Sequence, residues 1–83
     1  MDREIDIEKA HLAQANHHIA EAEGRLARQK QLIEELTADG HDTTNAKRML
    51  QTLEATLKTM HAHRQLLLRE VTAVDTAEPP RSF

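Results

Sequence analysis

The sequence predicts an all-α fold: an antiparallel two-helix hairpin, packed like a coiled coil, which we expect to dimerise into a four-helix bundle. Two series of aliphatic side chains at heptad spacing support this prediction, and an Asp39-Gly40 pair separates them. Seven residues make two helical turns, so each series lies along one helix face. The predicted domain covers 1–75, with a helix over 2–38, a turn over 39–42, a helix over 43–74, and a disordered C-terminal tail over 76–83.

The first helix is predicted from a large aliphatic side chain at every seventh position, and this series consists of Ile5, Leu12, Ile19, Leu26 and Ile33. The residue three positions after each completes an a/d pattern of the kind that packs helix on helix. This second series is Glu8, Ala15, Ala22, Gln29 and Leu36. Because most of its members are small or polar, we expect a neighbouring backbone to approach closely.

The turn is predicted at Asp39-Gly40, because glycine readily adopts the left-handed conformation that ends a helix. Asp42 or Thr43 then offers a side-chain oxygen to the free amides of the next helix. A connection this short makes the two helices antiparallel neighbours. The second helix has its own seam, spaced alternately by four and three: Ala46, Leu50, Leu53, Leu57, Met60, Arg64, Leu67, Val71 and Val74. For Arg64 we expect either an aliphatic stem lying over apolar surface or a pairing with an acid of a partner chain.

Dimerisation is predicted because 83 residues with a single aromatic side chain and no cysteine form a small core without a disulfide. A two-fold pairing of hairpins would cover apolar side chains beside the seam. An elongated monomeric hairpin is the alternative. The residues predicted at the interface are Ile19, Leu26, Leu32, Leu57, Met60 and Leu68.

Composition argues against several classes of partner. The net charge is −3, and the chain lacks both a basic excess and the aromatic side chains on which bases stack. We therefore predict no nucleic-acid binding. Because the sequence has no basic segment followed by an apolar run and no stretch of membrane-spanning length, we also predict no membrane association and a cytoplasmic location. The lack of cysteine is compatible with a reducing compartment.

Six histidines suggest chemistry that the spacing only partly supports. A helical metal site needs ligands three or four residues apart, and no two of these histidines have that spacing. The Glu8-x-x-His11 pair matches di-iron carboxylate bundles, and Glu70 is predicted at the same end of the hairpin. A dimer axis at that end would gather two such sets. A small metal-binding bundle using Glu8, His11 and Glu70 is therefore the alternative function.

The paired histidines His17-His18 and His61-x-His63 suggest two other roles, a phosphoacceptor site and a pH-dependent dimer contact. Phosphoacceptor histidines of sensor-kinase dimerisation domains are followed directly by an acid, and His18 is followed by Ile19, so that match fails. Histidines grouped across a dimer would instead make its stability depend on pH near 6 to 7, which is a hypothesis from the ordinary histidine pKa.

Catalysis has no support in the residue content. The chain has no cysteine, Ser82 is its single serine, and Gly24 and Gly40 are too few for a glycine-rich phosphate loop. We predict no enzyme activity, no cofactor and no resident metal. The predicted role is a helical interaction or regulatory module that acts through self-association and contacts with another protein.

The segment from Gln29 to Met60 resembles a group of small, largely uncharacterised helical-hairpin proteins of alphaproteobacteria. The resemblance rests on an Asp-Gly-His-Asp-Thr turn followed by a Leu-x-x-Leu-x-x-x-Leu helix, and its residues are Gln29, Leu36, Gly40, His41, Asp42, Thr43, Ala46, Leu50 and Leu57. It implies a helical hairpin without implying an activity. It supplies no catalytic residues.

Overall fold

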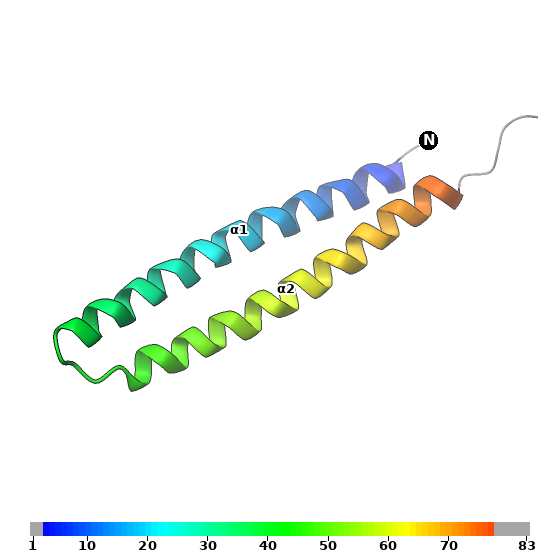
Figure 1. The fold of residues 1–83 in the computed structure, drawn as a ribbon. Helices are drawn as coiled ribbons and strands as arrows, with labels where there is room; N and C mark the ends of the chain where they lie inside the picture. Colours follow the sequence, from blue (N-terminus) through cyan, green and yellow to red (C-terminus); the bar gives the residue numbers. More distant parts are fainter. Residues whose placement is uncertain (1–2, 78–83) are drawn as a thin grey trace, which may run out of the picture.

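The computed structural model describes residues 3–77, with side chains described for 6–73, and it contains two helices joined by a short turn. Helix α1 spans Arg3–Ala38 and helix α2 spans Thr44–Ala77. The helices run antiparallel, side by side along their length, with the turn at one end (Figure 1). The prediction of an all-α helical hairpin is confirmed, and no strand occurs within 3–77.

The helix bounds differ slightly from those expected. Helix α1 is described from Arg3, so its predicted start at position 2 lies outside the described residues, and α2 runs from Thr44 to Ala77 rather than over 43–74. The longer helix is explained by the position of the first proline, Pro79, since only the residue directly before a proline is pushed out of the α conformation. Residues 78–83, the rest of the predicted tail, lie outside the described residues.

The core is a single row of side chains between the helices, which we call the seam. Among residues 6–73 its buried members are Ala15, Ile19, Ala22, Leu67 and Val71. The two alanines occupy the small positions of the first heptad series, where the absence of a long side chain lets α2 come close. The buried members lie in the half of the hairpin away from the turn.

The rest of the seam is covered only in part. Its half-buried aliphatic side chains are Leu12, Leu26, Ile33, Leu36, Leu50, Leu53, Leu57 and Met60. No side chain within 6–73 falls below 2% exposure. Two helices alone can shield a side chain from two directions but leave the flanks of the seam open to solvent, so this partial burial follows from the fold.

The end of α1 has the geometry predicted for Gly40. Its φ is +75°, in the left-handed region that favours glycine. The amide of Gly40 donates to the carbonyl of Thr37 at 3.1 Å, and the amide of His41 donates to the carbonyl of Leu36 at 2.8 Å. This pair of bonds is a Schellman motif, which satisfies carbonyls that the helix would otherwise leave unpaired.

The start of α2 is capped by Asp42, one of the two residues considered for that role. Its Oδ1 accepts hydrogen bonds from the Thr44 amide at 3.0 Å and from the Thr44 hydroxyl at 2.7 Å. The Thr44 hydroxyl and then the Thr44 amide hold the pKa of the Asp42 carboxyl below its usual 3.8. The backbone carbonyl of Thr43 accepts from Lys47 at 2.9 Å and so begins the helical hydrogen-bond pattern.

Gln29 ties the helices together near the turn. Its Nε2 donates to the carbonyl of Ala46 on α2 at 3.0 Å in a partly buried setting. A polar side chain in a seam restricts the register because its hydrogen bond is lost when the helices slide.

Candidate interaction surface

The hairpin has two flanks that differ in chemistry. Successive residues of a helix rotate by about 100° in one sense, so residues that directly follow a seam residue project to one side and residues that directly precede one project to the other. In an antiparallel pair the following residues of both helices share one flank. Glu23 follows Ala22 and His61 follows Met60, and their contact confirms this geometry.

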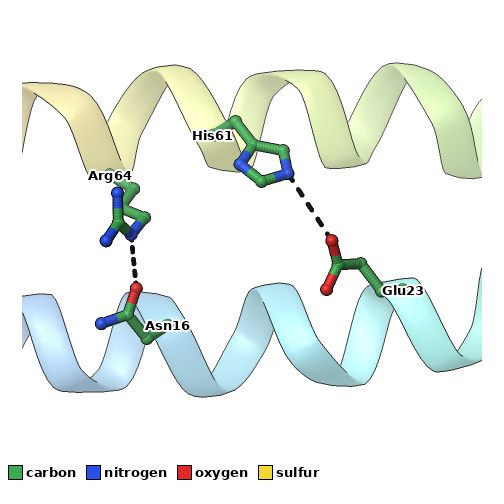
Figure 2. Close-up of polar contacts among 4 residues, drawn as sticks. All are labelled: Asn16, Glu23, His61 and Arg64. Carbon is green, nitrogen blue, oxygen red and sulfur yellow. Dashed lines mark hydrogen bonds and ion pairs between the residues drawn. The ribbon is translucent and has the colours of Figure 1, made fainter.

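The flank of following residues is bridged by polar contacts, and we call it the polar flank (Figure 2). The imidazole Nε2 of His61 lies 4.0 Å from Oε2 of Glu23, with both side chains about half exposed. The Nε of Arg64 donates a hydrogen bond to Oδ1 of Asn16. Arg64 is the one polar residue of the α2 seam, and its hydrogen-bond partner Asn16 belongs to the same chain. The Arg64 guanidinium therefore has a partner without an acid or a second chain.

The opposite flank carries the exposed large apolar side chains, which lie among charged residues such as Glu21, Arg25 and Arg28, and we call it the apolar flank. Within the described side chains the exposed large hydrophobic residues are Ile7 at 52%, Leu32 at 42%, Met49 at 51% and Leu66 at 55%. Each directly precedes a seam residue, so all four project to the same side. Ile7 and Leu66 lie towards the open end of the hairpin, and Leu32 and Met49 lie towards the turn.

The residues predicted at a dimer interface fall into three places. Ile19 is buried between α1 and α2, and Leu26, Leu57 and Met60 are half-buried there. Leu32 lies on the apolar flank.

Leu68 is half-buried and follows Leu67, which puts it on the polar flank. Leu32 and Leu68 therefore border opposite sides of the seam and do not form one surface. The sequence reasoning paired them because both adjoin the seam, and it overlooked Ile7 and Leu66. The signal that identifies the missed pair is their place directly before a seam residue.

The candidate metal ligands are not assembled within one chain. Glu8 is half-buried on α1, while His11 and Glu70 are exposed. Among the described residues, no group of three or more histidine, aspartate or glutamate side chains is placed to hold a metal ion.

The paired histidines have separate surroundings. The Nε2 of His17 lies 3.7 Å from Oε2 of Glu21, one turn further along α1, and the rings of His17 and His18 are 6.1 Å apart and tilted. His61 instead faces Glu23 across the hairpin. Exposed ion pairs of this kind contribute at most about 1 kcal/mol, and only when the imidazole is protonated.

Neither α1 nor α2, over the part of the chain described, has an apolar stretch long enough to cross a membrane. Comparison with protein-family models, with curated proteins and with solved structures found no match to this chain. The resemblance of its turn segment to the alphaproteobacterial hairpins stays a prediction.

Proposed function

We propose that the chain is a non-enzymatic helical interaction module that acts by self-association, with two hairpins forming a four-helix bundle. The observation that supports this most strongly is the partial burial of the seam. Eight of its aliphatic side chains remain half-buried in the single hairpin, and four more large apolar side chains are exposed on one flank. A second pair of helices is the simplest way to remove this surface from water.

Size supports the same proposal. A chain of 83 residues buries a modest share of its apolar surface, and this one has no disulfide to restrict its unfolded state. Oligomerisation is the common remedy in chains of this length. The residue content also favours an interaction role over catalysis, since the sequence contains no cysteine and a single serine at position 82.

The proposal is tested by molar mass in solution. Light scattering on the untagged chain across a dilution series should give twice the protomer mass of 9.4 kDa at high concentration and fall towards it on dilution. The thermal midpoint should rise with protomer concentration in the same range, because association stabilises the folded state by mass action. A mass that stays at one protomer at millimolar concentration would refute self-association.

A further inference from the structure

We propose that the second copy docks on the apolar flank in an inverted orientation, so that the two turns lie at opposite ends of the bundle. This inference rests on the proposed self-association and adds to it the face and the direction of packing. The polar flank is already bridged within one chain by Asn16, Glu23, His61 and Arg64, whereas the apolar flank exposes large hydrophobic side chains. A partner gains more by covering apolar surface than by displacing polar groups that are already paired.

The area of the flank suits a second hairpin. Helix α1 has 36 residues, so the flank is about 54 Å long at 1.5 Å per residue. Two helices side by side, each roughly 10 Å across, give a surface on the order of 1,000 Å². Stable dimers bury about 800 Å² on each partner, so a second copy of the same length fits this requirement without any other chain.

The inverted orientation follows from where the four apolar side chains lie. Ile7 and Leu32 are 25 residues apart on α1, and the point midway between them is at Ile19-Ala20. Met49 and Leu66 are 17 residues apart on α2, and their midpoint is at Leu57-Lys58.

The structure puts these two midpoints within about one helical turn of the same level along the hairpin. The three contacts between the helices, which join Gln29 to Ala46, Arg64 to Asn16 and His61 to Glu23, place a residue between 55 and 64 opposite position 20. A single two-fold axis across the hairpin at this level therefore serves both helices. It brings each apolar side chain at the open end of one hairpin opposite an apolar side chain at the turn end of the partner.

In that arrangement Ile7 packs on Leu32 of the partner subunit, and Leu66 packs on Met49 of the partner subunit. All four apolar side chains are then covered. Close to the axis, Glu21 faces His18 of the partner subunit, and α2 contributes the uncharged Thr56 and Thr59.

A two-fold axis parallel to the helices, which would keep the turns together, covers less. It joins Leu32 to Met49 of the partner subunit, but the same three contacts set Leu66 opposite a residue between 9 and 18, where this flank carries only polar side chains such as Gln14 of the partner subunit. Ile7 then lies opposite a residue between 68 and 77, beside Glu70 and the small Ala73 of the partner subunit.

The face is tested by paired charge substitutions on the full chain. Leu32→Glu with Met49→Glu should raise the dimer dissociation constant at least about a hundredfold, because four carboxylates would replace the apolar side chains that pack against the partner. The matched control is Ala20→Glu with Ala27→Glu, which adds the same charges at exposed positions following seam residues, on the polar flank, and should change the constant less than about fivefold. Circular dichroism checks that each variant remains helical.

The orientation is tested by a distance between labels. The chain has no cysteine, so His41→Cys in the exposed turn gives one spin-label site per protomer. Inverted packing places the two labels roughly 60 Å apart, twice the length of helix from position 20 to the turn, and the same-end packing places them about 20 Å apart. Pulsed electron–electron double resonance measures distances in this range and distinguishes the two values.

The outcomes distinguish the two proposals. A protomer that stays monomeric refutes self-association as a whole. A dimer with labels near 20 Å, or one that tolerates the Leu32 and Met49 charges, retains self-association and overturns this inference.

Discussion

Replacing Ile19 with alanine tests whether the seam is packed as the structure describes. Ile19 is 6% exposed, the lowest value among the buried side chains. The substitution removes three carbons, which at about 0.8 kcal/mol each corresponds to roughly 2 kcal/mol of transfer free energy. A cavity adds less than in a globular core because two helices can close around it, so we expect a total loss of about 2 to 3 kcal/mol. In a domain of this size that lowers the melting temperature by roughly 10 to 20 °C.

The matched control is Ile33→Ala, which changes the same residue type in the same heptad series. Ile33 is half-buried, so the loss should be about half as large. Leu57→Ala belongs to the same group, because Leu57 is also half-buried in the single hairpin. The assay is urea unfolding by circular dichroism at two protomer concentrations, since association would raise all midpoints together. An Ile33→Ala loss equal to that of Ile19→Ala at low concentration would refute the burial order along the seam.

Three further predictions concern the turn, the cap and the cross-helix hydrogen bond. Gly40→Val should lower the free energy of unfolding by about 1 to 2 kcal/mol, because φ is +75° while no atom lies within 4 Å of an added Cβ. Gly40→Asn should lower it less, and an unchanged urea midpoint for valine would contradict the left-handed turn. Because the pKa of Asp42 is lowered, its charge stabilises the folded state above the unfolded-state pKa, and this contribution disappears as pH falls through the folded-state value, below 3.8. The urea midpoint of the wild type relative to Asp42→Asn, which keeps an acceptor without the charge, should therefore decrease below that pH; parallel pH curves would exclude this role. A double-mutant cycle of Arg64→Ala and Asn16→Ala should show a coupling of about 0.5 to 1 kcal/mol, and a coupling near zero would mean that the hydrogen bond between them adds nothing in solution.

The sequence by itself determined the hairpin and its turn. Heptad spacing sets which face of each helix points inward, because that direction depends only on the fixed rotation per residue. Gly40 could also be assigned in advance and the cap narrowed to Asp42 or Thr43, since a left-handed helix end and a capping side-chain oxygen are local requirements of the backbone. The structure confirms the role of Gly40 and the all-α fold, and it shows that Asp42 is the residue whose side chain accepts the Thr44 amide.

Only the tertiary structure decided which side chains of the two helices meet beside the seam. The opposite flanks of Leu32 and Leu68 follow from their places before and after a seam residue, but their positions in the sequence do not say which side chains of the other helix lie next to them. The partners of Arg64 and His61 depend on which α1 side chains stand at the same level, and that level depends on the geometry of the turn that joins the two helices. The contacts beside the seam join residues that are far apart in the sequence. The periodicity of one helix does not say which residues of the other helix lie at the same level, so it cannot predict these contacts.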